Sequence, residues 1–163
     1  HYRSPVNYCE AAVHNSQAAL QRLYTAIRDL PDAIAPEKHP LKAAFFTAMQ
    51  DDFNTPQAFS VLFDMAKEIN CLREKEASQQ AAELAALMRE CGALLGVVQL
   101  DANAFLQQGS TSHDVTQIEG LIQARNDARA NKDWAKADAL RHELDAMGVV
   151  LDDTAAGTKW RLQ

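Results

Sequence analysis

The chain has 163 residues, a formal net charge of −6 and three widely spaced cysteines. Its apolar content of 47% and charged content of 23% are typical of a soluble globular protein with a buried core, and no apolar run is long enough for a membrane span. The cysteines form no metal-binding or disulfide pattern and favour reduced thiols in a cytoplasmic protein, while the acidic balance argues mildly against a nucleic-acid partner.

The first part of the chain contains four amphipathic patterns, each typical of an α-helix. Asn7 with Glu10 fits a capping box for the first helix, and Pro31 should end it. Asn54 or Thr55 is a suitable N-cap for the third. Short connections predict a mainly α fold that opens with an antiparallel four-helix bundle over residues 1–106. The expected helices are about 7–30, 40–50, 55–75 and 78–95.

A polar stretch rich in serine and glycine separates this bundle from the rest of the chain. Residues 107–116 have the sequence QQGSTSHDVT, which indicates a linker. Thr116 with Glu119 then fits a second capping box, which predicts a helix from Gln117 to about Ala130.

The last part of the chain predicts a helix followed by a β-hairpin. Asp133 is a good N-cap for a helix from Trp134 to Met147, and Gly148 should end it. Residues 149–151 and 158–162 alternate as two strands around a turn. Residues 117–163 should therefore form a small α/β domain of two helices and a hairpin.

The two predicted tail helices meet in the stretch ARANKDWAKADALR, residues 128–141. Five of the chain's 16 lysines and arginines lie between Arg125 and Arg141, so a positive potential is expected there. Single-stranded RNA is bound by aromatic rings that stack on bases, by carboxylates that accept from base edges and by cations that hold phosphates. Trp134 and Asp138 are four residues apart and share a helix face. The stretch thus holds all three kinds of group.

A purely structural interpretation of the same residues remains open from the pattern. Trp134 could fasten the two tail helices together, Asp138 and Arg141 could form a surface ion pair, and Trp160 could belong to the hairpin core. The periodicity alone favours this interpretation over an RNA site.

We find no motif that indicates catalysis or metal binding. The sequence lacks a Gly-rich phosphate loop, a serine-nucleophile motif and a paired-histidine zinc motif. Asp51 and Asp52 are adjacent at a helix end and point in different directions, so we expect them to cap or solvate the loop. No catalytic and no metal-binding residue is predicted.

Four stretches carry a resemblance to a known family. They are HYRSPVNY at 1–8, DDFNTPQAF at 51–59, ARANKDWAKADALRHELDAMGVVLDD at 128–153 and GTKWR at 157–161. Together, and in this order, they resemble the C-terminal region of the bacterial cysteinyl-tRNA synthetases and span essentially the whole chain.

The resemblance implies a fold and a setting. The fold would be a helical bundle of the DALR anticodon-binding type followed by a small anticodon-binding tail. In the full-length enzyme, a cysteine–tRNA ligase, a catalytic domain with zinc, ATP and magnesium would precede these residues. The chain is then expected to be a fragment with no cofactor of its own, inactive alone, cytoplasmic, monomeric and without a membrane partner. Its partners would be tRNA-Cys, through the anticodon stem-loop, and its own catalytic domain.

The resemblance also implies roles for individual residues. The cysteine anticodon is GCA, and each of its bases presents a donor that a carboxylate can accept. Trp134 would stack on an anticodon base, Asp138 and Asp153 would accept from base edges, and Arg129 would contact a base or phosphate. The remaining cations would mainly hold the RNA backbone; they are Lys132, Arg141, Lys159 and Arg161.

Two alternatives accompany this reading of the sequence. The whole chain could be a helical protein-interaction module with no RNA role. The DDFNTP stretch, residues 51–56, is expected to shape a helix start, although contact with tRNA or with the catalytic domain is the competing interpretation.

Overall fold

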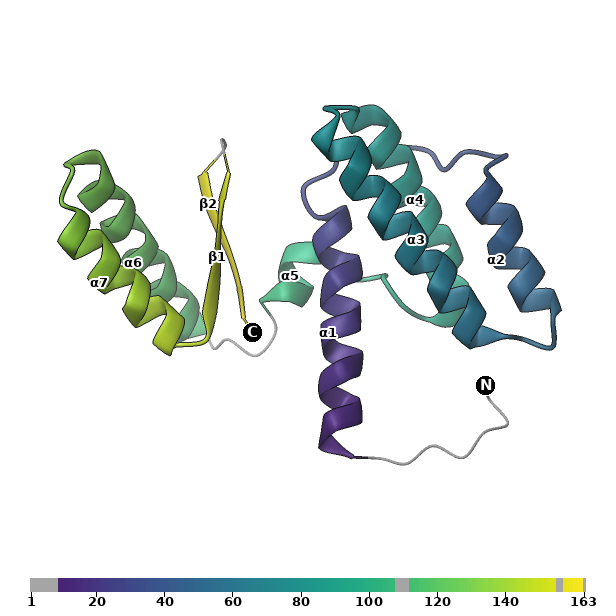
Figure 1. The fold of residues 1–163 in the computed structure, drawn as a ribbon, viewed down its shortest axis with the longest axis horizontal. Coiled ribbons are helices and arrows are strands. Elements are labelled where there is room, and N and C mark those ends of the chain that lie inside the picture. The colour runs from purple at the N-terminus through teal and green to yellow at the C-terminus, as the bar shows by residue number, and fades with distance from the viewer. Residues whose placement is uncertain (1–8, 108–111, 155–156, 163) are drawn as a thin grey trace. The chain divides into compact units, whose positions relative to one another are not determined.

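The computed structural model describes residues 9–107, 112–154 and 157–162. At residues 112–114 and 154 it describes the backbone alone. Within this part the chain forms seven helices and one antiparallel two-stranded hairpin (Figure 1). It divides between Phe105 and Leu106 into two compact units. None of the described helices is both long and apolar enough to cross a membrane.

Four long helices make up most of the first unit. In the view of Figure 1, α1 and α3 run upwards while α2 and α4 run downwards. The helix α3 packs against each of the other three, and α4 also touches α1 and α2. The helices are α1 (Glu10–Ile27), α2 (Pro40–Gln50), α3 (Thr55–Glu74) and α4 (Ser78–Leu95).

The core of this unit lies where α3 meets its neighbours. Its largest fully buried side chains include Leu23 of α1, Phe45 of α2, Met65 of α3 and Met88 of α4. The short helix α5 (Ala102–Leu106) follows, and its Phe105 ring stacks on Tyr24 with ring centroids 3.9 Å apart.

Helices α2, α3 and α4 confirm the predicted elements. Asn54 is the N-cap of α3, because its side-chain oxygen accepts a hydrogen bond from the Gln57 N–H at 3.3 Å. Gly96 follows α4 in the left-handed conformation that ends many helices.

Helix α1 differs from its prediction at its C-terminal end. It ends at Ile27 rather than at Pro31, since Arg28 is extended and Asp29 has a φ of 62°. Val13 is 45% exposed, so the apolar stripe reaches the core only in the second half of the helix. At its start, the helix begins at Glu10 with the extended Cys9 as its N-cap residue, not at the predicted cap Asn7, which itself lies outside the described residues.

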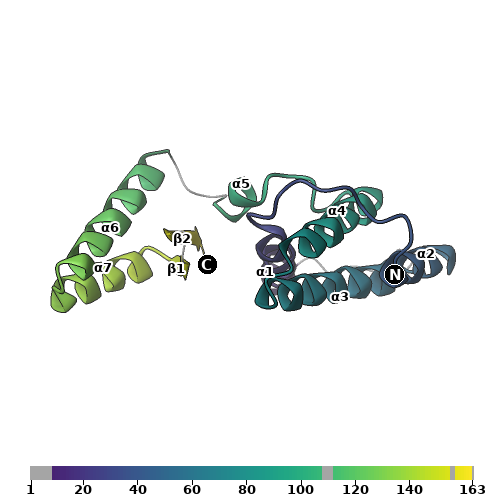
Figure 2. The ribbon, with the colours of Figure 1, turned by 90° about the horizontal axis from the view of Figure 1, so that it is seen from above.

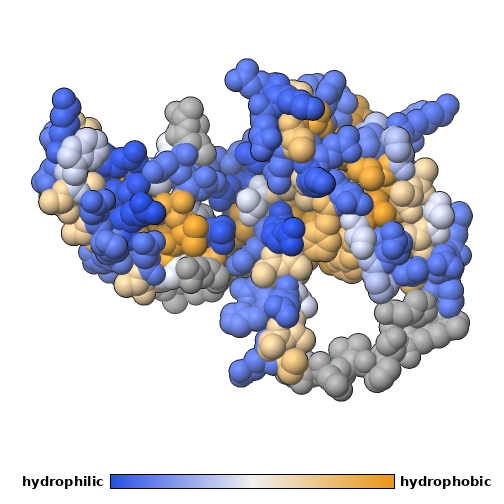
Figure 3. All heavy atoms as spheres, viewed as in Figure 1, coloured by the Kyte–Doolittle hydropathy of each residue, from blue (hydrophilic) through white to orange (hydrophobic). Residues whose placement is uncertain are grey.

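The second unit consists of two helices packed on the hairpin. Figure 1 and Figure 2 both place α6 (Ser112–Ala130) and α7 (Trp134–Ala146) on the same side of strands β1 (Val149–Thr154) and β2 (Gly157–Leu162). On the face that Figure 3 shows, apolar atoms are visible between the helical pair and the hairpin. The buried cluster there is Ile118, Ile122, Leu144, Val149 and Trp160.

The start of α6 corrects two predictions. The helix begins at Ser112 instead of Gln117, so residues 112–116 are helical although the sequence placed them in the linker. Thr116 therefore lies inside the helix and is not its N-cap. Val115 packs against the buried cluster one turn before Ile118, and this contact favours helix where the polar composition indicated a linker.

Helix α7 and the hairpin follow the prediction closely. Asp133 is the N-cap of α7 and accepts from the Lys136 N–H at 3.2 Å. The helix ends at Ala146, one residue before the predicted Met147, and Gly148 has a φ of 74°. Both strands are longer at the turn than the alternation indicated. Gly157, predicted in the turn with residues 155–156, begins β2, and residues 155–156 lie outside the described part.

Candidate nucleic-acid interface

The hairpin register separates two faces with different chemistry. Leu151 pairs with Trp160, and Asp153 pairs with Thr158. Because side chains alternate along a strand, these residues share the face that packs on the helices. At the turn end of this face, the apolar layer gives way to the Asp153 carboxylate and the Thr158 hydroxyl.

The carboxylate of Asp153 joins the hairpin to the C-terminal half of α6. Arg125 donates two parallel hydrogen bonds, from Nη1 to Oδ1 at 3.1 Å and from Nη2 to Oδ2 at 2.8 Å. Arg129 donates from Nη1 to Oδ2 at 2.9 Å. The Thr158 hydroxyl donates to Oδ1 at 2.7 Å and lies 3.2 Å from the side-chain oxygen of Asn126. One carboxylate thus fixes two arginines.

The bonded arrangement strongly favours the charged forms. The hydrogen bonds from Arg125, and then from Thr158, hold the pKa of Asp153 well below its ordinary value, although partial burial acts in the opposite direction. The hydrogen bonds to Asp153 raise the pKa of Arg125, and the nearby charge of Asp138 on α7 adds to this. Asp138 therefore lies within electrostatic reach of the same cluster.

Arg125 was not among the predicted site residues, although the sequence contains a signal for it. It continues the Ile118, Leu121 and Ile122 stripe of α6 by one turn, and it is only 7% exposed. A buried arginine needs a partner, so an arginine at a core position predicts a carboxylate facing it.

The exposure of Trp134 decides a question that periodicity left open. The residue is 60% exposed at the first position of α7, so it does not fasten the two helices together. Asp138 and Arg141 are also exposed and continue the same side of α7. Trp160, in contrast, is only 6% exposed and belongs to the core of the unit.

Lys132 stands in the turn between the two helices, two residues before Trp134. It is exposed and has a φ of 60°, in the left-handed region that favours glycine. The Asp133 N–H donates to the Ala128 carbonyl at 2.9 Å, which closes the end of α6 around it. On the face that Figure 3 shows, this end of the unit is mostly hydrophilic.

Two of the predicted site residues lie on the other face of the hairpin. Lys159 pairs with Asp152 and Arg161 pairs with Val150, so all four side chains point away from the helical pair. The structure thus bonds Arg129 to Asp153 and brings Asp138 near their common partner Arg125. Lys132 and Trp134 follow Arg129 in the α6–α7 turn and at the start of α7, whereas Lys159 and Arg161 lie on the opposite face of the hairpin.

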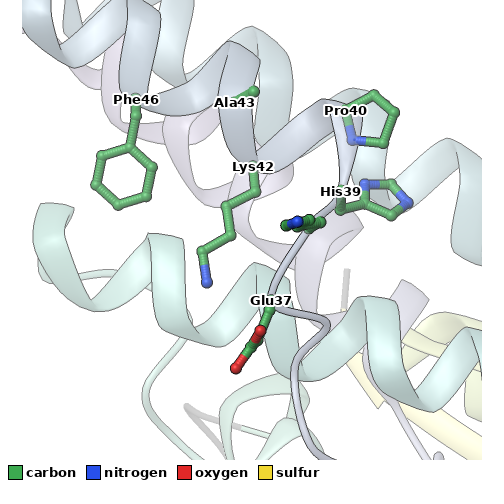
Figure 4. Close-up of a pocket in the computed structure, with 7 residues that line it drawn as sticks. Glu37, His39, Pro40, Lys42, Ala43 and Phe46 are labelled. Atoms are coloured by element: carbon green, nitrogen blue, oxygen red, sulfur yellow. The ribbon is translucent and has the colours of Figure 1, made fainter.

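The first unit contains a cavity of about 580 Å³ between the 37–39 segment and α2 (Figure 4). Two of its polar side chains, Lys42 and His39, have partners. Lys42 binds Glu90 at 2.9 Å, and His39 accepts the Leu41 N–H at 3.3 Å and so caps α2. Across the described residues, no group of three or more metal-binding side chains gathers.

Comparison with known proteins first gives the class of each unit. Residues 44–99 match the DALR domain, and residues 116–161 match the cysteinyl-tRNA ligase anticodon binding domain. The second match covers α7, the hairpin and nearly all of α6, including the end where the charged cluster lies. The chain thus combines the two modules of an anticodon-binding region.

Whole-chain relatives then give the family. The chain is 52% identical to the cysteine–tRNA ligases of Haemophilus influenzae and Pasteurella multocida over all of its length, and 50% identical to that of Aliivibrio fischeri over 99% of it. It belongs to the family formed by the C-terminal DALR and anticodon-binding domains of bacterial cysteine–tRNA ligases. It spans only 35–36% of the length of these relatives.

Proposed function

We propose that the chain is the tRNA-binding region of a cysteine–tRNA ligase and recognises the GCA anticodon of tRNA-Cys. The observation that carries this proposal is that Trp134 is 60% exposed at the first position of α7, on the same helix face as the exposed Asp138 and in the unit that holds the Arg129–Asp153 pair. Base stacking requires an aromatic ring that solvent can reach, whereas a tryptophan with a purely structural role is buried, as Trp160 is.

In this proposal the end of the second unit that carries the α6–α7 turn binds the anticodon loop. Trp134 stacks on one base, and Asp138 and Asp153 accept hydrogen bonds from base edges. Arg129 contacts a base or phosphate, while Lys132 and Arg141 hold the backbone. Lys159 and Arg161, on the opposite hairpin face, reach the RNA only if the strand passes around the sheet edge, so their contribution is expected to be smaller.

The rest of the proposal concerns the whole enzyme. Residues 1–106 would form the antiparallel four-helix bundle of the DALR type and contact the enzyme's own catalytic domain. That domain would attach cysteine to tRNA with ATP, magnesium and zinc, and we assign no residue of this chain to those groups. The enzyme would act as a monomer in the cytoplasm.

The decisive experiment replaces the exposed ring. Trp134→Ala should lower the affinity for tRNA-Cys about five- to hundred-fold, since stacking contributes about 1–3 kcal/mol per base. Circular dichroism and the melting temperature should stay unchanged because the ring is exposed. Unaltered affinity would favour the rival interpretation, a helical protein-interaction module without an RNA role.

A matched control removes another exposed aromatic ring. Phe53 of the DDFNTP stretch is 62% exposed in the first unit. If this stretch only shapes the start of α3, Phe53→Ala should leave tRNA affinity unchanged. An equal loss in both variants would mean that the bundle also contacts tRNA and that Trp134 has no special role.

A further inference from the structure

The Asp153 carboxylate already uses its full acceptor capacity. Each carboxylate oxygen accepts about two hydrogen bonds. Oδ1 receives Arg125 and Thr158, and Oδ2 receives Arg125 and Arg129, all at 2.7–3.1 Å. A base edge can therefore bind this carboxylate only by displacing one of the present donors.

The three donors to Asp153, which are Arg125, Thr158 and Arg129, differ in how easily each can leave the carboxylate. Arg125 makes two bonds and its side chain is 8% exposed, so its departure would leave a buried charge without a partner. The Thr158 hydroxyl is fixed between Asp153 and Asn126 on the inner face of the hairpin. Arg129 makes one bond to Oδ2, and its side chain is 45% exposed. Water can solvate Arg129 as it leaves, so it is the donor that is displaced most easily.

We propose that Arg129 occupies a position on Asp153 that a nucleobase takes over when RNA binds. This inference rests on the proposed function and adds a step to it. An amino or ring N–H group of the base replaces the Arg129 N–H on Oδ2, while Arg125 and Thr158 remain in place. The released guanidinium then binds an acceptor on the RNA, so one exchange produces two contacts.

The exchange gives the site a basis for selection. A base edge with only acceptors cannot replace Arg129, and the carboxylate repels it. Such a base should bind on the order of ten-fold more weakly than one with a donor at this point. Arg125 acts as a positioning residue, because it keeps the carboxylate oriented while the exposed partner changes.

Side-chain NMR of the arginines tests the exchange directly. The probe is an RNA hairpin with GCA in its loop, added to the chain labelled with ¹⁵N. At saturation the guanidinium signals of Arg129 should shift, while those of Arg125 keep their positions. An Arg129 signal that does not move, or an Arg125 signal that moves as much, would overturn the proposal.

A second test uses variants of the RNA hairpin, each of which lacks one hydrogen-bond donor on one anticodon base. One of them should bind the wild-type chain about ten-fold more weakly. This difference should persist in Arg129→Met, because Asp153 is intact there, and vanish in Asp153→Asn. If Arg129→Met abolishes it, Arg129 reads the base and the exchange is wrong. If Asp153→Asn does not fold, the NMR signals of the arginines and the Arg129→Met variant still test the exchange.

Controls separate the two proposals. Lys67→Met removes an exposed positive charge from the first unit and should change neither readout. A wild-type chain that does not prefer the GCA hairpin over a scrambled loop would overturn the proposed function and the exchange together. A preference for GCA without the Arg129 shift would overturn the exchange alone.

Discussion

Arg125 of α6 and Asp153 of β1 are joined by two parallel hydrogen bonds of 3.1 and 2.8 Å, across 28 residues of sequence. This pair ties the hairpin to the helical layer at the point where the apolar core ends. The side chain of Arg125 is 8% exposed and that of Asp153 is 41% exposed. Arg125 therefore depends on this pair for a partner, whereas water can also solvate Asp153.

The planar fork of Arg125 should be essential to this contact. Arg125→Lys keeps the charge but cannot donate two parallel bonds. We expect the free energy of unfolding of the second unit to fall by about 1–3 kcal/mol, measured by urea titration. Arg161→Lys, on the opposite hairpin face, should change it by less than about 0.5 kcal/mol. Equal effects would contradict the role of the bonded pair.

Asp153 should make stability depend on pH only under acid conditions. Its pKa is lowered in the folded state, so its stabilisation is complete above the ordinary carboxylate pKa of about 4. It should be lost as pH falls from there through the lower folded value. The stability difference between wild type and Asp153→Asn should thus be constant from about pH 5 to 8 and shrink below pH 4. A difference that changes near neutral pH would point to another group.

Lys132 should lower the stability of the fold and strengthen the binding of tRNA. Its φ of 60° suits glycine, so Lys132→Gly should raise the free energy of unfolding by about 0.5 kcal/mol. The variant should also bind tRNA-Cys more weakly, with a salt slope smaller by about 1 if Lys132 contacts a phosphate. Fluorescence titration at several salt concentrations measures both effects.

Glu76 provides the matched control for Lys132. It follows α3 in the same type of turn, with a φ of 57° and an Ala77 N–H to Leu72 carbonyl bond of 2.9 Å. Glu76→Gly should give the same gain in stability and leave tRNA affinity unchanged. A loss of affinity in this variant would mean that the backbone change, rather than the lysine charge, weakens binding.

Gly92 should be irreplaceable, whereas Gly120 should not. A Cβ at Gly92 would lie 2.7 Å from the Val97 carbonyl oxygen, and at Gly120 it would meet nothing within 4 Å. We expect Gly92→Ala to destabilise the first unit by about 1–3 kcal/mol and Gly120→Ala to stabilise α6 by about 0.5–1 kcal/mol. Thermal unfolding followed by circular dichroism distinguishes the two signs.

Local signals determined most of the secondary structure. Asn54 and Asp133 act as N-caps, and Gly148 follows α7 as expected, because each satisfies backbone groups within a few residues of itself. Local signals did not predict the start of α6 correctly. Val115 packs against a cluster to which Leu144, Val149 and Trp160 are contributed by distant parts of the chain, and the composition of residues 112–116 does not include that burial.

For the candidate site as well, some features follow from the sequence and others only from the tertiary structure. The sequence alone determined which residue types are concentrated between Arg125 and Arg141 and which family the chain resembles. Only the tertiary structure decided that Trp134 is exposed while Trp160 is buried, that Lys159 and Arg161 face away, and that Arg125 holds Asp153. These outcomes depend on hairpin register and on helix–hairpin packing, which bring together residues about 30 positions apart.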